Sequence, residues 1–452
     1  MLATLIPAPP PGDDWTATVR RQFAGGAPAS EYGAALACAD VDSDGWPEIC
    51  IGSPGEAGPG DLGPDTGAVH VLDGKTLEER LVLHGAAAGE RFGHALALTD
   101  WNRDSTPDLV VGAPGHADGK GALYVVTDLR DRDEDRAPLS PLLTGQRAGD
   151  RLGWSVANAP PKGGGMELQG VLAGAPGHDD KFGDDCGRAL FLVSGGKKKP
   201  PKVLAEWVGQ TPFAELGRFV DCSLYVTAKL ERMLLIGAPG ATARPFRDLP
   251  RAQHGQPLPS EDAPIEDVGL LLVFDGRGDE LFSLRGEAAG ERFGESATTV
   301  RLHGEGVQYG EILAGGHGLA RLHSREDGSR LSALPPEPGE PGFGLVVADI
   351  GQISTEYQFA FAVATLPPEA GAGPADGTAA ATPPAFTGVR VYSGADRSVI
   401  ARLERPADER YGFALRRWRP DKGFVSALLV GAPGRDRRRG AVELIDIAPA
   451  ER

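Results

Sequence analysis

The sequence predicts a nearly all-β chain in which seven like units close into a seven-bladed β-propeller of four-stranded antiparallel blades. Two observations predict this fold. An aromatic-Gly or Leu-Gly step recurs about every sixty residues, and a strand ending in Gly-Ala-Pro-Gly or a degraded form of it follows roughly twenty residues later. Between the steps, apolar residues alternate or form short runs, as in strands. The steps are Tyr32-Gly33, Phe92-Gly93, Leu152-Gly153, Leu216-Gly217, Phe293-Gly294, Phe343-Gly344 and Tyr411-Gly412.

The second unit shows most clearly how the strands of one unit follow each other. His94-Ala95-Leu96-Ala97-Leu98 has an alternating pattern and is expected to be a half-buried first strand. Asp108–Val111 is a continuous apolar run, typical of a second strand covered on both faces. Gly121–Val126 is the third strand, and the fourth is seen as Leu81–His84 or Leu281–Arg285 before the next step. No segment has helical spacing over the length that a helix needs.

The two ends of the chain predict that the ring is closed. The last unit stops after its third strand, at about Asp446, whereas Trp15–Phe23 matches the fourth strand of the other units. We therefore expect Trp15–Phe23 to become the outer strand of the last blade, which removes the open ends of a linear array. The predicted organisation is a tail at 1–14, the propeller at 15–447 and a tail at 448–452. An open solenoid would need capping repeats, which the sequence lacks.

The phase of the repeated motifs resembles that of the FG-GAP repeats in the propeller domain of integrin α-subunits. The resemblance covers nearly the whole chain, from Trp15 to Ile447, and the sixth unit is its weakest copy. It implies a calcium-binding recognition or adhesion module that is extracellular, at the cell surface or periplasmic. The four-residue Gly-Ala-Pro-Gly motifs, intact or altered, begin at Gly52, Gly112, Gly174, Gly237, Gly315 and Gly431.

Composition restricts the classes of partner and compartment. The chain has 63 acidic and 46 basic residues and a net charge of −17, which argues against nucleic acid as a general partner. No stretch approaches the roughly 18 apolar residues of a membrane span, and Met1–Pro11 lacks the basic start of a secretory signal. We expect a monomeric propeller. Cys38 and Cys50 are expected to be small buried residues rather than a disulfide.

The loops between the first and second strands of the first two units carry the strongest chemical signal. Oxygen-bearing residues stand at positions one, three, five and nine, and position seven can offer its backbone carbonyl. Calcium accepts six to eight such oxygens at about 2.3–2.6 Å, so we expect two Ca²⁺ sites. The ligands would be Asp40, Asp42, Asp44, Trp46 and Glu48 in the first loop, and Asp100, Asn102, Asp104, Thr106 and Asp108 in the second.

These loops differ from helical calcium-binding loops. Position twelve holds Ile51 or Val111 where a bidentate glutamate would stand. Gly45 occupies position six, where a left-handed backbone is expected, and Ser105 replaces it in the second loop. The resemblance implies the same hairpin layout, although the integrin metals lie in other blades. The alternative is an Asp-rich turn that only caps its own backbone. Repulsion among the acids favours calcium, with a structural role.

The loops on the opposite face are the expected place for a partner. Insertions at 54–66, 241–268 and 367–384 gather there, and long loops on a rigid scaffold often carry binding. For 241–268 disorder is an equal alternative, and the composition of 367–384 favours disorder. An acid-Arg pair precedes several steps and predicts either a ring of ion pairs between blades or a charged ligand mouth. These pairs are Glu90-Arg91, Asp150-Arg151, Glu291-Arg292 and Glu409-Arg410. His116 and His178, each near an acid, are interpreted as surface histidines rather than metal ligands.

These observations favour a non-enzymatic, calcium-stabilised binding module that engages a protein or glycan on its loop face. The chain lacks a Gly-x-Ser-x-Gly elbow, a His-Glu-x-x-His helix and a phosphate-binding Gly loop. One alternative is a secreted lyase or hydrolase with a site assembled from loops, which would show a deep axial pocket with perturbed pKa values. A binder would show a flatter face. A further alternative is a structural module of a surface assembly.

Overall fold

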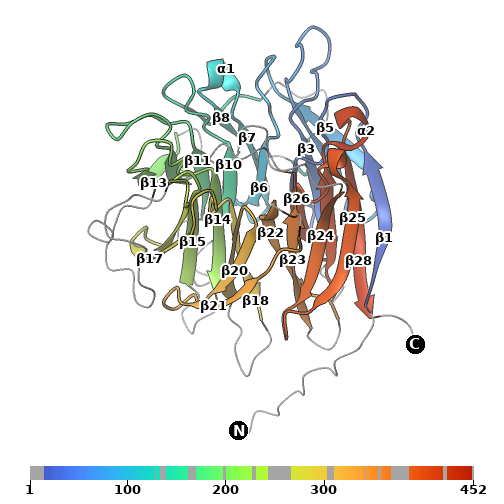
Figure 1. Ribbon diagram of the computed structural model, residues 1–452. Coiled ribbons are helices and arrows are strands. Elements are labelled where there is room, and N and C mark those ends of the chain that lie inside the picture. Colours follow the sequence, from blue (N-terminus) through green and yellow to red (C-terminus); the bar gives the residue numbers. More distant parts are fainter. Residues whose placement is uncertain are drawn as a thin grey trace.

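The chain folds into seven four-stranded antiparallel sheets around a central axis, as the sequence predicted. The computed structural model describes residues 15–127, 129–132, 139–160, 169–196, 200–225, 231–242, 266–302, 310–338, 340, 342–354, 358–367, 386–420 and 425–449. In these residues every sheet has four strands, and Figure 1 shows the sheets standing side by side in a ring. The first strands of neighbouring blades touch one another around a closed circle.

Each blade runs from its first strand at the axis to its fourth strand at the perimeter. Blade 1 contains β2 (Ala35–Ala39), β3 (Glu48–Ser53), β4 (Ala68–Leu72) and β5 (Glu79–His84); blade 2 contains β6 (Ala95–Thr99), β7 (Asp108–Ala113), β8 (Ala122–Val126) and β9 (Leu143–Thr144). Blade 3 contains β10 (Ser155–Ala159), β11 (Gly170–Ala175), β12 (Arg188–Val193) and β13 (Lys202–Val208).

The remaining blades follow the same order. Blade 4 contains β14 (Phe219–Tyr225), β15 (Glu231–Ala238), β16 (Leu270–Asp275) and β17 (Glu280–Arg285); blade 5 contains β18 (Ser296–Arg301), β19 (Gly310–Gly316), β20 (Leu319–His323) and β21 (Arg330–Leu334). Blade 6 contains β22 (Phe343–Gln352), β23 (Phe359–Thr365), β24 (Phe386–Ser393) and β25 (Val399–Pro406); blade 7 contains β26 (Ala414–Trp418), β27 (Ala427–Ala432), β28 (Ala441–Pro449) and β1 (Trp15–Ala24).

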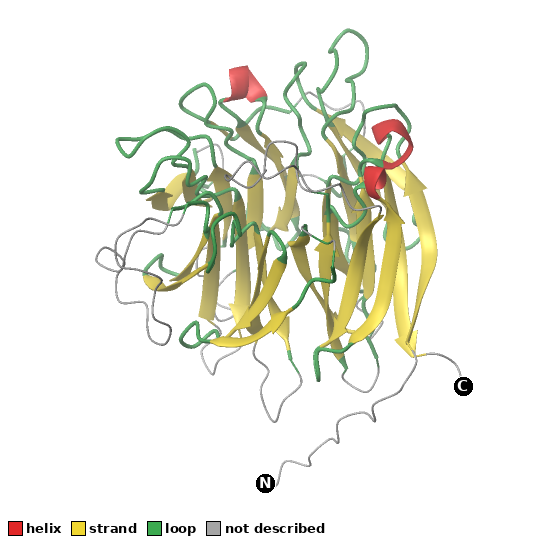
Figure 2. Ribbon diagram, in the orientation of Figure 1, coloured by secondary structure: helices red, strands yellow, loops and turns green. Residues whose placement is uncertain are grey.

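Helices are confined to short turns in the described residues. They are α1 (His116–Gly119), α2 (Arg435–Arg438) and the 3₁₀ turn η2 (Ala407–Glu409). Figure 2 shows α1 and α2 among the loops at one face of the ring, above a body of strands. None of the described helices has the length and apolar character that crossing a membrane requires.

Strand β1 closes the ring by pairing with β28, the last strand of the chain. Their antiparallel register runs from Trp15 opposite Pro449 to Ala24 opposite Ala441, and Figure 1 shows the first strand lying beside the last. The predicted closure is confirmed. Strand β28 continues to Pro449, past the boundary predicted at residue 447, because its final residues pair with the start of β1.

Glycine pairs join neighbouring blades near the axis. A Cβ atom added to Gly112 of blade 2 would lie 2.0 Å from the carbonyl oxygen of Gly153 in blade 3, a distance that no side chain tolerates. This contact explains why the step and the Gly-Ala-Pro motif recur together. The same contact, at 1.7–2.1 Å, joins Gly52 to Gly93, Gly174 to Gly217, Gly237 to Gly294, Gly315 to Gly344 and Gly431 to Gly33.

Blade 6 is the exception to this pattern. Its second strand has lost the motif, and Gly412 of blade 7 faces the Cβ of Ala364, at 2.9 Å from where its own Cβ would stand. This interface is therefore formed against a side chain, whereas the others are backbone against backbone.

Replacing a glycine of one pair should open its blade interface. We expect Gly112→Ala to lower the free energy of unfolding by about 3 kcal/mol or more, because the carbonyl of Gly153 cannot move without shifting blade 3. Urea unfolding would measure this loss. The matched control is Gly26→Ala, since a Cβ at Gly26 meets nothing within 4 Å. Equal stability of the two variants would contradict the packing argument.

Candidate functional site

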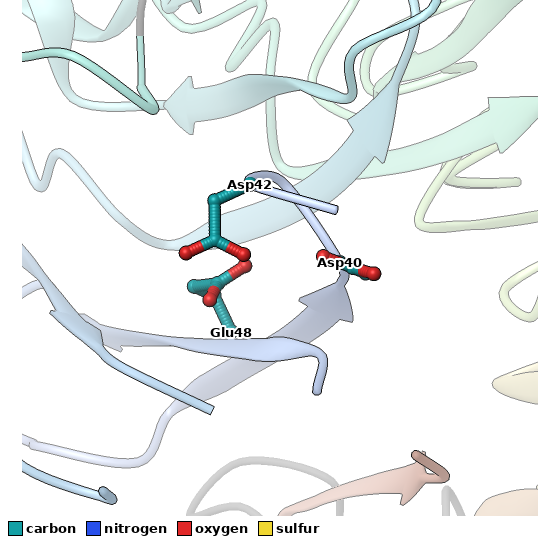
Figure 3. Close-up of side chains that lie close together, drawn as sticks. All are labelled: Asp40, Asp42 and Glu48. Carbon is teal, nitrogen blue, oxygen red and sulfur yellow. The ribbon is translucent and has the colours of Figure 1, made fainter. Parts of the chain in front are cut away.

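The first acidic loop joins β2 to β3 at the face opposite the glycine steps. Carboxylate oxygens of Asp40, Asp42 and Glu48 all lie within 4.8 Å of one another, and Figure 3 shows the three side chains gathered at the end of strand β2. Asp44 is not part of this group. Its Oδ1 instead accepts a hydrogen bond from the backbone N–H of Trp46 at 2.8 Å.

Backbone hydrogen bonds hold the first loop in a tight curve. Asp40 Oδ2 accepts from the N–H of Gly45 at 2.9 Å, and Asp42 Oδ1 accepts from that of Asp44 at 3.1 Å. Gly45 has φ +92°, the left-handed backbone that the sequence predicted for position six. The curve therefore draws acidic side chains toward one side of the loop.

The second loop, between β6 and β7, repeats three of the backbone hydrogen bonds of the first loop. Asp100 Oδ2 accepts from Ser105 at 3.0 Å, Asn102 Oδ1 from Asp104 at 2.9 Å, and Asp104 Oδ1 from Thr106 at 2.8 Å. Ser105 adopts φ +70°, so this loop keeps the left-handed turn without its glycine. Two loops with different side chains thus share one backbone shape.

The acid at position nine is buried in both loops and carries a raised pKa. Glu48 Oε2 accepts from the N–H of Val41 at 2.7 Å, and Asp108 Oδ2 accepts from that of Asn102 at 3.0 Å. Burial raises the pKa of Glu48, with Asp42 adding to it. Burial also raises the pKa of Asp108 to about 7, helped by Asp104 and Asp100. Buried, mutually repelling carboxylates are a donor set suited to a hard cation.

The loops differ in how closely their acids gather. In the described residues, only the first loop brings three acids within 4.8 Å of one another. In the second loop Asn102 replaces an acid, and its side-chain amide donates to Asp104 Oδ2 at 2.8 Å. The neutral amide therefore supplies part of the compensation that a cation would give.

A cavity of about 560 Å³ opens at the axis on the other face, where the glycine steps lie. The residue after each step lines it, so all seven blades contribute. The sequence analysis did not predict this set. The signal that could have found it is the shared position directly after each step glycine, but the seven residue types have no chemistry in common. They are Ala34, His94, Trp154, Arg218, Glu295, Leu345 and Phe413.

One wall of the cavity is a closed set of ion pairs between blades 4 and 5. Arg218 lies 3.0 Å from Glu295 and 3.7 Å from Glu215, and Arg292 contacts the same two acids. Burial would raise the pKa of Glu295, but the two guanidinium groups outweigh it and lower that pKa. Glu295 is therefore a charged, hydrogen-bonded group rather than a proton donor.

Comparison with known proteins names the repeat. The family model described as FG-GAP repeat matches residues 32–72 and 92–126, in blades 1 and 2. The chain carries FG-GAP repeats. Integrin α relatives confirm the predicted resemblance: integrin alpha-6 of Gallus gallus is 31% identical over 146 residues, which are 31% of this chain and 13% of that protein.

Longer alignments show similarity between this chain and a phospholipase. Phosphatidylinositol-glycan-specific phospholipase D of Homo sapiens is 27% identical over 312 residues, covering 64% of this chain and 35% of that protein. The Rattus norvegicus protein of that name is 30% identical over 252 residues, covering 50% and 28%. The chain thus spans about a third of the length of these relatives.

A solved structure shows the same fold at low sequence identity. A chain in the crystal structure of BBS1N in complex with ARL6DN aligns with a TM-score of 0.53 and 13% identity, over 96% of this chain and 97% of that one.

The acid-Arg pairs before the FG-GAP steps contribute ion pairs between blades, which was one of the two predictions for them. Arg91 lies 2.6 Å from Glu31, and Arg292 contacts Glu215. Both arginines and Arg410 line the cavity, whereas Arg151 is not among its lining residues. The acids of these pairs turn away from the axis and pair within their own blade. The side chains that pair with these acids are His116 for Glu90, His178 for Asp150, Arg321 for Glu291 and Arg435 for Glu409.

This pairing corrects the interpretation of His178 as a surface residue. Only 8% of His178 is exposed, and its Nδ1 lies 3.1 Å from Asp150. The acid next to it in the sequence is Asp179, but the ring contacts Asp150, the acid that precedes the step. His116 likewise contacts Glu90, at 2.6 Å.

The other candidates are in part outside the described residues. Most of the insertion at 241–268 and nearly all of the one at 367–384 fall there. The cysteines are free: Cys50 is buried and Cys38 half-buried, as expected for small apolar residues. The insertion at 54–66 is described, and its Glu56 lies 2.9 Å from Nε2 of His70 in β4.

Raising the pH should weaken the fold through His70. Burial would lower its pKa, but Glu56 and Glu79 outweigh it and raise the pKa from 6.5 to about 9. The resulting stabilisation is fully present below pH 6.5 and is lost as the pH rises through about 9. Urea unfolding should show a loss on the order of 2 kcal/mol. His70→Gln should remove this part of the pH dependence, and an unchanged slope would refute the assignment.

Proposed function

We propose that this chain is a calcium-stabilised binding propeller that recognises a protein or glycan with its loop face and performs no chemistry of its own. The observation that carries the proposal is the axial cavity, to which each of the seven blades contributes the residue after its glycine step. A mouth built by every repeat on one rigid face is typical of a recognition site. The integrin α relatives support this reading.

The alternative is an enzyme, and two observations favour it. The relatives that align over 312 and 252 residues are named as a phospholipase D. An axial cavity, in place of the flatter face expected of a binder, is the feature expected of a propeller enzyme. The ionisation of the cavity favours binding. Glu295 has a lowered pKa, whereas a general acid needs a raised one. A structural module of a surface assembly is the third candidate, and it requires no ligand in the cavity.

Calcium would bind in the two hairpin loops. Asp40, Asp42 and Glu48 already lie together in the first loop, with Asp44 and the carbonyl of Trp46 as further donors. Asp100, Asn102, Asp104, Asp108 and the carbonyl of Thr106 would serve in the second. A bound cation would neutralise carboxylates that otherwise repel one another, which stabilises the folded chain.

The first loop also contacts the blade that closes the ring. Trp46 packs against Trp418 of blade 7 with ring centroids 5.9 Å apart, and Trp418 Nε1 donates to the carbonyl of Pro47 at 2.9 Å. The guanidinium of Arg20, in closing strand β1, lies 5.3 Å from the Trp418 ring. A cation in this loop would therefore stabilise the closure itself.

The second loop packs against blade 3 rather than against blade 7. Its Trp101 is buried in one apolar cluster with Val171 and Leu190 of blade 3. A cation here would fasten blade 2 to blade 3, far from the closing strand in the order of the ring. The two sites therefore differ in what they stabilise.

Removing the two cation sites one at a time should separate these roles. We expect calcium to raise the melting temperature and to slow amide hydrogen exchange in β1. Asp42→Asn should lose the protection of β1, whereas Asp100→Asn should keep it and lose only part of the rise in melting temperature. Isothermal titration should count two sites in the original chain and one in each variant.

The control for this test is Asp279→Asn, an exposed acid in the turn between β16 and β17. It should bind two calcium ions and melt like the original chain. The absence of any calcium effect on the chelated chain would overturn the proposed metal sites, and equal protection of β1 in both site variants would overturn the link to closure.

The resemblance to integrin α also supports an extracellular, cell-surface or periplasmic location, where calcium at the millimolar level would fill such sites. Partition of the native protein between these compartments would test the location directly.

Binding through the loop face is tested by capture from native extract. We expect the immobilised chain to retain a defined partner, identified by mass spectrometry, and Ala34→Trp to lose it because the added ring fills the cavity. Leu331→Trp is the control, since Leu331 lies exposed on the outer strand β21. Equal capture by both variants would show that the loop face is not the binding surface.

A parallel measurement distinguishes the enzyme. Incubation of the calcium-loaded chain with phosphodiester lipids and with polysaccharides should give no product. Turnover that Glu295→Gln abolishes would overturn the non-enzymatic proposal.

A further inference from the structure

The axial cavity has two walls of unlike chemistry. Blades 2, 4 and 5 supply most of its charged side, and blade 6 with Phe413 of blade 7 supplies its apolar side, although Arg410 of blade 7 also lines the cavity, with its guanidinium 4.3 Å from the Phe413 ring. The charged side includes Arg91, Arg218 and Arg292, and the apolar side includes Leu345 and Phe413. A ligand that fills the cavity therefore needs a polar part and an apolar face.

Arginines outnumber glutamates in the lining in spite of the acidity of the chain. The lining contains four arginines and three glutamates, although the whole chain has a net charge of −17. Each glutamate contacts two arginines: Glu31 contacts Arg91 and Arg438, and both Glu215 and Glu295 contact Arg218 and Arg292; Arg91 also lies 3.6 Å from Asp65. The charges are thus nearly balanced, but each guanidinium carries five N–H groups, so N–H donors outnumber acceptors in the cavity.

The backbone at these arginines is strained. Arg91, Arg292 and Arg410 precede their steps with φ of +55°, +46° and +50°. A left-handed backbone costs a residue other than glycine about 1 kcal/mol or more. The chain nevertheless keeps a charged residue at this position, where glycine would relieve the strain, and it does so for either sign, since Glu31 and Glu215 also line the cavity with φ of +58° and +54°.

His94 adds a hydrogen-bond acceptor beside these donors. Its Nδ1 lies 3.0 Å from the carbonyl oxygen of Trp154, which can only accept, so Nδ1 carries the hydrogen. Burial, reinforced by the charges of Arg91 and Arg218, lowers the pKa of His94 to about 4. The ring is therefore neutral at pH 7, and Nε2 has a lone pair for a hydroxyl group.

We propose that the axial cavity binds an anionic sugar, a hydroxylated ring bearing a carboxylate, phosphate or sulfate group. The anionic group would lie among Arg91, Arg218 and Arg292, a ring hydroxyl would donate to Nε2 of His94, and the less polar face of the sugar would pack on the opposite wall. A cavity of about 560 Å³ is in the range that encloses small ligands. This inference rests on the proposed function and specifies its ligand.

Titration of four sugars into the calcium-loaded full chain tests the proposal. Glucuronate, glucose 6-phosphate and glucose 6-sulfate should bind, and glucose should bind at least about tenfold more weakly because it leaves the guanidinium groups without an anion. The strongest of the three identifies the anionic group. Nuclear magnetic resonance of the His94 ring should show its pKa rising when an anion is bound, which a ligand elsewhere would not cause.

Two variants and a control localise the site. Arg91→Gln should weaken the anionic sugars by about tenfold and leave glucose unchanged, while Ala34→Trp should abolish binding of all four. Arg330→Gln, which breaks a perimeter ion pair with Glu287, should bind like the original chain. Circular dichroism confirms that each variant is folded.

Three results would overturn the proposal: equal affinity for glucose and the anionic sugars, no binding of any sugar by the folded chain, or undiminished binding by Arg91→Gln. Binding of an acidic peptide in place of the sugars would also overturn it. A protein partner captured through the loop face would in those cases leave the proposed function standing and remove only its assignment to a sugar.

Discussion

The contact between two glycines at each blade interface determines the rest of this structure. The carbonyl oxygen of a step glycine fits only where the next sheet has no side chain, as at Gly112 and Gly153. That contact fixes how closely neighbouring sheets approach and so how many complete the circle. It also fixes direction: each first strand starts at the step beside the axis and ends at a hairpin on the opposite face. The cavity and the acidic loops therefore occupy opposite ends of the same strands.

The fold could be predicted from sequence because its signals are local and repeated. The period of the steps, the alternation in each strand and the match of Trp15–Phe23 to a fourth strand all lie within short segments. The two acidic loops could be predicted for the same reason. Starting from Asp40 and from Asp100, both have oxygen-bearing residues at positions one, three, five and nine. The left-handed backbone at Gly45 followed from its residue type alone.

Which side chains meet could not be predicted in this way. His178 is buried against Asp150 within blade 3, and Arg91 bonds to Glu31 of the neighbouring blade. Both distances depend on the folded ring and not on a local pattern. The cavity was missed for a related reason. Its seven residues have one position in common, but Ala34, Trp154 and Glu295 share no chemistry, so no pattern marks them. Only the three-dimensional arrangement shows that these seven residues meet at one place.

The pairing of Trp15 with Pro449 has a consequence for how the module can be joined to other domains. Both residues lie at the hairpin end of blade 7, and Figure 1 shows β1 and β28 side by side. Any tether or fused domain would attach at this one corner, on the side away from the mouth. The opening of the axial cavity would then face away from the attached domain, whichever terminus is used.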